Sequence, residues 1–341
     1  MIVAALSAAY GAVATWRRRW YAARPSRRVH LSQPVISVGN LRVGGSGKTP
    51  ATACIAALLL ERGERPVILS RGYARQHPSS DVTVVSDRVR VLTDVAHAGD
   101  EPFLLARALP GVPVLVCVNR QRAGLVGEAR FDASVHVLDD GFQHVKLARD
   151  IDLLLVDVDD LTDRVLPGGR LREPLANASL AHAIITPGPS RDTARSIAKR
   201  LRVSDAFAMT CVLGLPTALS GGAPLAADAP VLAVAGIARP ERFFNDLRTS
   251  GFNVCGTQVF PDHHVFTERD LTTIVSNARA YGATGVVTTE KDAVRLTGMD
   301  LSALSFSAVP LLARIEPAEE FATWLTERLA RSRASRSSVG S

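Results

Sequence analysis

The sequence predicts an α/β protein in which a parallel β-sheet carries helices on both faces and a smaller α/β domain follows. Short apolar runs alternate with helical stretches along most of the 341 residues, which is typical of such a sheet. After residue 34 the first run, PVISVG, leads into a glycine-rich turn. From Pro230 a second alternation begins, and its length of roughly 100 residues suits a smaller domain.

Residues 1–28 form a segment of different character. The apolar run MIVAALSAAYGAVAT precedes WRRRWYAARPSRR, which holds six arginines, two tryptophans and a tyrosine. Fifteen apolar residues are too few to cross a bilayer, which takes about 20. The charge also follows the apolar run, whereas in a cleaved signal peptide it precedes it. We expect the segment to associate with a membrane surface; the alternative is a helix packed on its own domain with solvated arginines.

Residues 29–205 are predicted to form the larger domain. A helix is expected from Lys48 or Thr49 to Gly63. Five further apolar runs are typical of buried strands: RPVILS, VPVLVCV, ASVHVLDD, IDLLLVDV and HAIITPG. Ligands of parallel sheets bind at the carboxyl ends of the strands. The glycine-rich turn falls at such an end, so we expect the functional site there.

The remaining chain is predicted to contain a hinge, the smaller domain and a tail. Residues 206–229 are rich in Gly, Pro and Ala, and we expect a ribbon-like hinge of two short strands around Ser220-Gly221-Gly222. Residues 230–330 form the smaller domain, and residues 331–341 are low in complexity and expected to be disordered. Helices of the smaller domain are expected at residues 240–250, at residues 267–281 and from Glu290.

Charge and composition exclude nucleic acid as a partner. The hydrophobic content of 47% is enough for folded cores, while aromatic residues make up only 5% and argue against base-stacking surfaces. The net charge of +7 comes from the first 60 residues, which hold eight basic side chains and no acidic one, so the rest of the chain is nearly balanced. The four cysteines are far apart without C-x-x-C spacing, which favours reduced cysteines in a cytosolic protein.

The turn VGNLRVGGSGKTP resembles the phosphate-binding loop G-x-x-x-x-G-K-[ST], although Arg42 takes the place of the first glycine. Consecutive backbone N–H groups and a helix N-terminus suit a phosphate. Lys48 would reach the β and γ phosphates, and the Thr49 hydroxyl would ligate magnesium. The residues predicted to bind the nucleotide are Arg42, Val43, Gly44, Gly45, Ser46, Gly47, Lys48 and Thr49.

Such a loop also needs a carboxylate near the magnesium, at the end of a neighbouring strand. The run VHVLDDGFQH offers Asp139 and Asp140, and the run DLLLVDVDD offers Asp157, Asp159 and Asp160. We prefer the first pair because it stands directly at a strand end. The second group is expected to be an acidic loop that faces water.

Four other segments hold candidate site residues. In GDEP, Asp100 stands at the start of a helix, where capping is its simplest role. In FPDHHVF, adjacent histidines make a poor metal pair, but Asp262 and His263 could handle the proton of an attacking hydroxyl. In PGGRLREP, Arg172 could hold a phosphate or lie exposed. The segment LSRGY follows a strand and so opens onto the ligand edge.

Taken together, these segments resemble the tetraacyldisaccharide 4′-kinase family. The matching stretches, in order between residues 37 and 296, are SVGNLRVGGSGKTP, LSRGY, GDEP, LDDGFQH, PGGRLREP, FPDHHVF and TTEKDAVRL. The family's loop shares the departure at Arg42. The resemblance implies a P-loop NTPase-like enzyme that transfers the γ-phosphate of ATP to the 4′-hydroxyl of tetraacyldisaccharide 1-phosphate, which gives the 1,4′-bisphosphate precursor of lipid A. It also implies a place at the cytoplasmic face of the bacterial inner membrane.

The resemblance also implies roles for residues. Asp100 would accept the proton of the sugar hydroxyl with support from His263, and Lys48 would neutralise phosphate charge. Because Asp100 and His263 belong to different predicted domains, we expect the site to be complete only when the domains close and exclude water. The remaining implied contacts are Thr49 and Asp139 for Mg²⁺, with Asp140 and Glu173 as further partners, Arg172 for phosphate, Ser70, Arg71 and Tyr73 for the disaccharide, and Glu290, Lys291 and Asp292 for the nucleotide.

The expected partners are the lipid disaccharide and the membrane surface, with no obligate protein partner. Two other functions stay open. A membrane-associated P-loop ATPase switch would explain the loop and the basic N-terminus but not DHH or LREP. A kinase for a soluble sugar is disfavoured by the membrane-like N-terminal segment.

Overall fold

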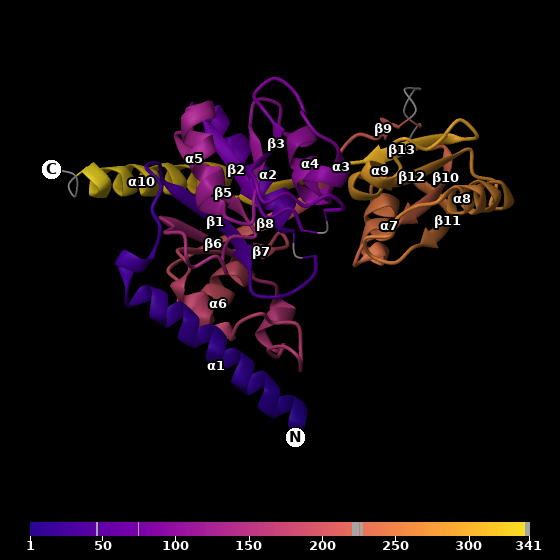
Figure 1. Ribbon diagram of the computed structural model, residues 1–341. Helices are drawn as coiled ribbons and strands as arrows, with labels where there is room; N and C mark the ends of the chain where they lie inside the picture. Colours follow the sequence, from indigo (N-terminus) through magenta and orange to yellow (C-terminus); the bar gives the residue numbers. More distant parts are fainter. Residues whose placement is uncertain (46, 74, 220–224, 226–227, 338–341) are drawn as a thin grey trace. The chain divides into compact units, whose positions relative to one another are not determined.

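The computed structural model describes residues 1–45, 47–73, 75–219, 225 and 228–337 (Figure 1). The chain divides into two compact units. The larger unit comprises Met1–Thr210 and Ala313–Ser341, and the smaller unit comprises Cys211–Leu312. Residues 313–330, which the sequence assigns to the smaller domain, therefore belong to the larger unit.

The larger unit is built on a nine-stranded sheet with the order β14-β8-β7-β6-β1-β5-β2-β4-β3. The strands from β8 to β4 pair in parallel, and β3 pairs antiparallel with β4. The predicted α/β fold class is confirmed. The strands are β1 Val35–Asn40, β2 Pro66–Ser70, β3 Thr83–Ser86, β4 Val114–Val116, β5 Val135–Asp139, β6 Ile151–Leu155, β7 Ala183–Pro187, β8 Asp205–Leu213 and β14 Leu311–Glu316.

Helices cover this sheet. Helix α2 begins at Lys48 as predicted, and Gly63 follows its end with a left-handed φ of 80°. It packs on β1, β2 and β5 because Ala51, Ile55 and Leu59 form its buried face. The helices of the larger unit are α1 Ile2–Ala22, α2 Lys48–Glu61, α3 Val95–Ala98, α4 Asp100–Ala108, α5 Arg120–Phe131, α6 Arg191–Leu201 and α10 Ala318–Ser337, with 3₁₀ turns η1 Pro25–Arg27, η2 Val158–Leu161 and η3 Leu175–Leu180.

Strand β1 places the glycine-rich turn in the middle of the sheet. It lies between β5 and β6, and all of its residues are buried. Its register pairs Val38 with Asp139, the last residue of β5. The carboxyl ends of β1 and β5 therefore meet at one edge, where the turn after β1 and the carboxylates after β5 can share a ligand.

The smaller unit has a five-stranded sheet with the order β11-β10-β12-β13-β9. Leu232, Val286 and Phe306 pack with Ile274 of α8 on one face, and Val231 packs with residues of α7 on the other. The three expected helices are confirmed. The elements are β9 Thr217–Ala218, β10 Pro230–Ala235, α7 Pro240–Thr249, β11 Asn253–Val259, α8 Glu268–Ala280, β12 Gly285–Thr289, α9 Glu290–Arg295 and β13 Ser305–Val309.

The segment expected to be a ribbon-like hinge, residues 206–229, is described only in part. Strand β8 belongs to the nine-stranded sheet, whereas β9 pairs antiparallel with β13 in the five-stranded one. Both strands precede the predicted turn, so the ribbon-like pairing across that turn stays a prediction. The predicted turn at Ser220-Gly221-Gly222 lies outside the described residues.

The expectation of a disordered tail is wrong for residues 331–337, which continue helix α10, while 338–341 lie outside the described residues. Arg333 donates two hydrogen bonds to Glu64, at 2.8 and 2.7 Å, and Arg336 donates to Asp150 at 2.7 Å. The sequence shows the charges of the tail but not their partners, which come from distant parts of the chain.

We expect the ion pair between Arg333 and Glu64 to make stability depend on pH. The hydrogen bond from Arg333 lowers the pKa of Glu64 in the folded chain. The pair therefore stabilises fully above the unfolded pKa of about 4.3, and its contribution is lost as the pH falls through the lower folded value. An Arg333→Met variant should melt at a lower temperature than the wild type at about pH 7, and the difference should shrink toward about pH 3.

Thermal denaturation across this pH range measures the effect. Arg331→Met is a matched control, because Arg331 forms an exposed pair with Glu327 on the same helix. Equal, pH-independent shifts in the two variants would contradict the assignment.

Candidate active site

The turn between β1 and α2 depends on glycines with left-handed backbone. Gly44 has a φ of 92°, and Gly47, the residue before α2, has a φ of 80°. A Cβ on Gly47 would lie 3.0 Å from Met209 Cε, so a side chain is poorly accommodated there. The N-terminus of α2 opens directly into this turn, which suits a phosphate. Ser46 lies outside the described residues.

Arg42 supports this turn from inside the protein. Its side chain is buried, and its guanidinium donates to Asp160 Oδ1 at 3.1 Å and to the Gly45 carbonyl at 3.2 Å. The backbone beside it is also fixed, because Val43 N donates to the Arg170 carbonyl at 2.9 Å. The side chain of Arg42, predicted among the nucleotide-binding residues, thus points to a carboxylate of its own chain.

The acidic run after β6 does not face water as a whole, contrary to the sequence-based expectation. Asp160 is buried beside Arg42, and burial raises the pKa of its carboxyl. Asp157 caps η2 in a reciprocal arrangement with Asp160. Asp159 alone of these three aspartates is exposed. The run therefore holds the glycine-rich turn in place.

Asp139 ends β5 as a buried carboxylate. Its side chain accepts a hydrogen bond from the Thr52 hydroxyl at 3.1 Å. Burial, together with the charges of Glu101 and Asp140, raises the pKa of Asp139 to about 7, while Lys48 opposes the shift. A cation at this carboxylate would favour its charged form. Sequence reasoning missed Thr52, although its place one helical turn after Lys48 is a usable signal.

Asp140 links three of the predicted motifs. Arg172 donates to both of its carboxylate oxygens, each at 2.8 Å, and also to the Asn40 side chain. Lys48 Nζ lies 3.8 Å from Asp140 Oδ1. Burial alone would raise the pKa of Asp140, but the hydrogen bonds from Arg172 and the charge of Lys48 lower it. The structure therefore brings Lys48, Asp140 and Arg172 together, with Asp139 beside them.

Glu173, suggested by the resemblance as a magnesium partner, has other contacts. It is buried, and its two oxygens accept from Arg18 of α1 at 2.7 and 2.8 Å. Asn177 donates to the same carboxylate at 2.9 Å. Because both oxygens are engaged, this geometry does not support a metal role for Glu173.

Asp100 is the first residue of α4, not its cap. The preceding residue, Gly99, is the N-cap, and it has no side-chain capping bond. A Cβ on Gly99 would lie 2.9 Å from the Tyr73 carbonyl, so GDEP and LSRGY touch. Since the charge of Glu101 raises the pKa of Asp139, the start of α4 also lies near the end of β5. The simple capping role of Asp100 is therefore not observed.

Of the three residues predicted to contact the disaccharide in the turn after β2, two have exposed side chains and one is buried. Ser70 is buried, whereas Arg71 is exposed and Tyr73 is 72% exposed.

Sequence reasoning also missed Arg120, the buried first residue of α5, which donates to the carbonyls of Cys117 and Val118. Burial lowers the pKa of Arg120 to about 10, although the charge of Asp139 opposes the shift. Its position shortly after β4, at the start of the next helix, is a signal that could have identified it.

In the smaller unit, FPDHHVF and TTEKDAVRL come together. Arg295 Nη2 lies 3.2 Å from His263 Nδ1, and Lys291 Nζ lies 3.5 Å from His263 Nε2. Arg295 is itself held by Asp292 at 3.1 Å. His264 contacts Asp270 instead, at 3.0 Å. The adjacent histidines therefore have different partners, and no cluster of three or more metal-ligating side chains occurs among the described residues.

Comparisons with known proteins show what this chain is similar to. The family model described as LpxK, tetraacyldisaccharide-1-P 4′-kinase, matches residues 1–330. The tetraacyldisaccharide 4′-kinase of Geobacter metallireducens is 38% identical over 93% of this chain and 94% of its own length, and that of Desulfotalea psychrophila is 37% identical over 89% and 90%. A crystal structure of LpxK from Aquifex aeolicus in complex with ATP is 31% identical, covers 96% of this chain and 100% of its own, and gives a TM-score of 0.78.

We expect an Asp160→Asn substitution to weaken both the fold and nucleotide binding. It leaves the buried Arg42 without its nearest charged partner, so the free energy of unfolding should fall by about 3 kcal/mol. Urea denaturation and ATP titration measure the two effects. Asp159→Asn is the control, because that side chain is exposed on the same turn. If both variants behave alike, Arg42 does not hold the loop through Asp160.

Proposed function

This chain belongs to the tetraacyldisaccharide 4′-kinase family, and we propose how its own residues carry out the phosphoryl transfer. The enzyme transfers the γ-phosphate of ATP to the 4′-hydroxyl of tetraacyldisaccharide 1-phosphate, a step of lipid A biosynthesis. The observation that carries the proposal is the convergence of Lys48, Asp140 and Arg172 beside Asp139 at the sheet edge.

The glycine-rich turn and Lys48 would hold the nucleotide phosphates. Backbone N–H groups at the start of α2 point to this turn, and Lys48 would neutralise the β and γ phosphates. Arg172, already oriented by Asp140 and Asn40, would meet charge on the transferred group. Arg42 would act indirectly, by holding the turn.

The oxygen donors at the end of β5 fit a magnesium ion. Magnesium is usually held by one or two carboxylates together with water and substrate phosphates. Asp139 is a buried carboxylate with a raised pKa, and we propose that it and the Thr49 hydroxyl hold the ion. The ion would supply neutralising charge to the phosphates. Asp140 and Glu173 are each engaged by an arginine and would support the site.

Asp100 is proposed to take the proton of the acceptor. As the 4′-hydroxyl oxygen bonds to the γ-phosphorus, the bond from that phosphorus to the ADP oxygen breaks and the hydroxyl proton passes to Asp100. A negative charge at the first position of α4 is favoured by the helix dipole. The supporting role of His263 rests on the family resemblance, and Arg295 and Lys291 orient its ring.

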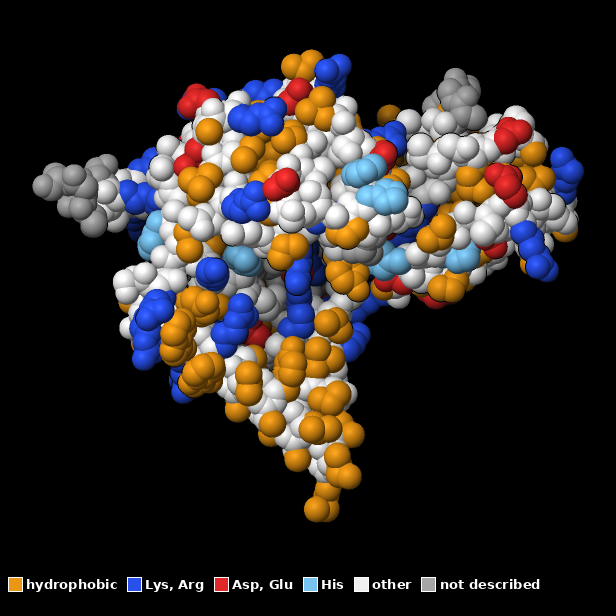
Figure 2. Space-filling view, in the orientation of Figure 1, with side chains coloured by type: hydrophobic (Ala, Val, Ile, Leu, Met, Phe, Trp, Pro, Cys, Tyr) orange, Lys and Arg blue, Asp and Glu red, His pale blue; other side chains and the backbone are white. Residues whose placement is uncertain are grey.

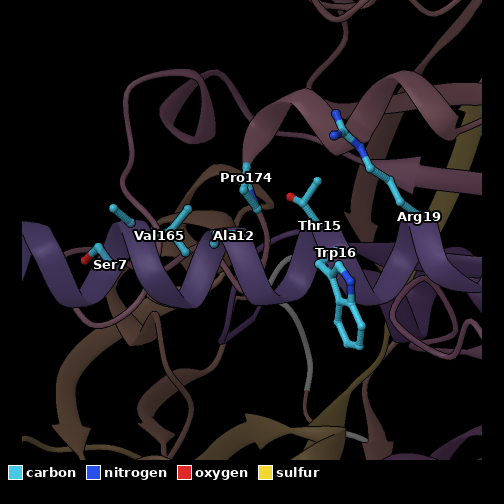
Figure 3. A pocket seen from close by; sticks show the side chains of 9 residues that line it. Ser7, Ala12, Thr15, Trp16, Arg19, Val165 and Pro174 are labelled. Carbon is cyan, nitrogen blue, oxygen red and sulfur yellow. The ribbon is translucent and has the colours of Figure 1, made fainter.

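Helix α1 is proposed to place the enzyme at the membrane. Its exposed apolar side chains gather toward the N-terminus (Figure 2): Ile2, Val3, Leu6, Tyr10, Val13 and Trp16. Beside the contact of α1 with Val165 and Pro174 lies an open groove of about 440 Å³, which Ser7, Ala12 and Trp16 also line (Figure 3). None of the described helices combines the length and hydropathy of a membrane span. We therefore propose an interfacial helix, at the cytoplasmic face of the inner membrane, next to the lipid acceptor.

Replacing the proposed base should abolish transfer but preserve nucleotide binding. We expect Asp100→Asn to lower the transfer of label from radiolabelled ATP to the lipid disaccharide by about 10²- to 10⁴-fold, with unchanged affinity for ATP. Asp94→Asn is the control, since Asp94 caps the neighbouring helix α3. Normal transfer by Asp100→Asn would refute the base. Label released from the wild type only as free phosphate, with or without lipid, would refute the kinase and favour an ATPase switch.

Charging the apolar face of α1 should release the protein from lipid. Because Leu6 and Val13 are exposed on α1, we expect the double variant Leu6→Glu/Val13→Glu to bind vesicles of phosphatidylglycerol and phosphatidylethanolamine at least about tenfold more weakly. Vesicle sedimentation measures the binding. Val89→Glu, in an exposed turn, should bind as the wild type does. Undiminished binding of the double variant would exclude α1 as the membrane contact.

A further inference from the structure

Arg18 is the one buried charged residue among the described residues of α1. Its Nε and Nη2 donate to Glu173 Oε2 and Oε1 at 2.7 and 2.8 Å. Nη2 also donates to the Phe142 carbonyl at 2.8 Å, and the guanidinium lies 4.1 Å from the centroid of the Phe142 ring. One side chain of the N-terminal helix thus binds two segments of the catalytic unit at once.

Both of these segments carry active-site residues. Glu173 directly follows Arg172, and Phe142 stands two residues after Asp140. Arg172 and Asp140 form the bidentate ion pair beside Lys48. Arg18 therefore links the Glu173 and Phe142 segments from the side of α1. The bond between Arg172 and Asp140 links the same two segments from the side of Lys48.

The segments that Arg18 binds are packed closely against the glycine-rich turn and the strand before it. A Cβ on Gly39 of β1 would lie 2.6 Å from Phe142 Cβ, so Phe142 packs directly on the strand that feeds the glycine-rich turn. The backbone of Arg172 also donates to the Leu41 carbonyl in that turn. A shift of the Phe142 or Glu173 segment would therefore reach the turn itself.

Arg18 belongs to a docking face of α1. Residues at positions 7, 11, 15 and 18 lie on one side of a helix. Ser7 accepts from Gly168 N at 3.0 Å, a Cβ on Gly11 would lie 3.1 Å from Pro174, and the Thr15 hydroxyl lies 3.4 Å from Asn177 Nδ2. The same Asn177 nitrogen donates to Glu173. Of the exposed apolar residues of α1, Ile2, Leu6, Val13 and Trp16 fall on the opposite side of the helix.

We infer that Arg18 is a positioning residue for phosphoryl transfer, which fixes the Asp140 and Arg172 segments only while α1 is docked on the larger unit. Without Arg18, the buried Glu173 would keep an uncompensated charge, and its segment would move to relieve it. The membrane-associating helix is then also a structural part of the phosphate site. The inference rests on the proposed roles of Asp140 and Arg172 in that site.

The test compares lysine substitutions of two arginines that each form a buried, bidentate ion pair with a carboxylate. Arg18→Lys and Arg149→Lys each keep the positive charge but lose the planar guanidinium that makes two parallel hydrogen bonds to a carboxylate. Arg149 is the matched control, since its pair with Asp152 is equally buried, at 2.7 and 3.1 Å, and it is not placed in the site. We expect similar losses of melting temperature. Only Arg18→Lys should lower kcat, by about 100-fold, and weaken the binding of ATP with Mg²⁺.

Glu173→Gln provides a second variant in case Arg18→Lys folds poorly. We expect it to lower kcat as well, and the double variant Arg18→Lys/Glu173→Gln to be no worse than the more damaged single one, because the two residues act as a unit. An additive double variant would overturn the inference.

Two outcomes separate this inference from the proposed function. If Arg18→Lys and Arg149→Lys have the same kcat and the same affinity for ATP with Mg²⁺, Arg18 is structural only and the inference fails. ATP affinity is measured without lipid, so that comparison stands even if the wild type transfers no label to the lipid. Absence of label in the lipid would refute the kinase function alone.

Discussion

The buried ion pair between Arg42 and Asp160 is the interaction on which the glycine-rich turn, the proposed phosphate site, depends. A buried guanidinium is strongly unfavourable unless its charge is matched and its donors are satisfied. Here Arg42 meets Asp160 and the Gly45 carbonyl, so the turn after β1 can close only around that pair. The arginine that breaks the glycine pattern of the loop is therefore the feature that fixes it. The left-handed glycines then leave room for a phosphate at the start of α2.

Pairing of arginine with carboxylate recurs throughout the site, each time with a different role. Arg172 orients Asp140 at the solvent side of the turn, and Arg18 holds Glu173 on the protein side. Asp139, which has no arginine partner among its described hydrogen bonds, has a raised pKa, whereas that of Asp140 is lowered. The two adjacent carboxylates thus differ in what they can bind: the arginine-paired Asp140 is satisfied, and Asp139 gains most from an added cation.

The sequence predicted those features that depend on local pattern. Apolar runs located the core strands, and the glycines with Lys48 located the turn between β1 and α2, because periodicity and backbone freedom are properties of neighbouring residues. The partners of Arg42, Arg18 and Arg333 could not be predicted, since a charge in a sequence does not show which distant carboxylate it meets. The same limit explains the errors at Asp160 and in the tail, where solvent exposure was inferred from composition alone.

In the proposed function, helix α1 meets two requirements that are usually met by separate elements. A membrane-binding helix must expose apolar side chains, while a helix that supports an active site must bury specific polar contacts. The 3.6-residue period separates the two: Ser7, Thr15 and Arg18 face the larger unit, and the exposed apolar residues Ile2, Leu6, Val13 and Trp16 lie on the opposite side. Arg18 contacts the backbone two residues after Asp140. The depth at which α1 lies in a lipid surface would therefore set the distance between that surface and the proposed phosphate site. An acceptor whose acyl chains stay in the membrane would need that distance to match the position of its sugar hydroxyl, and a helix fixed by the buried ion pair of Arg18 and Glu173 would provide the match.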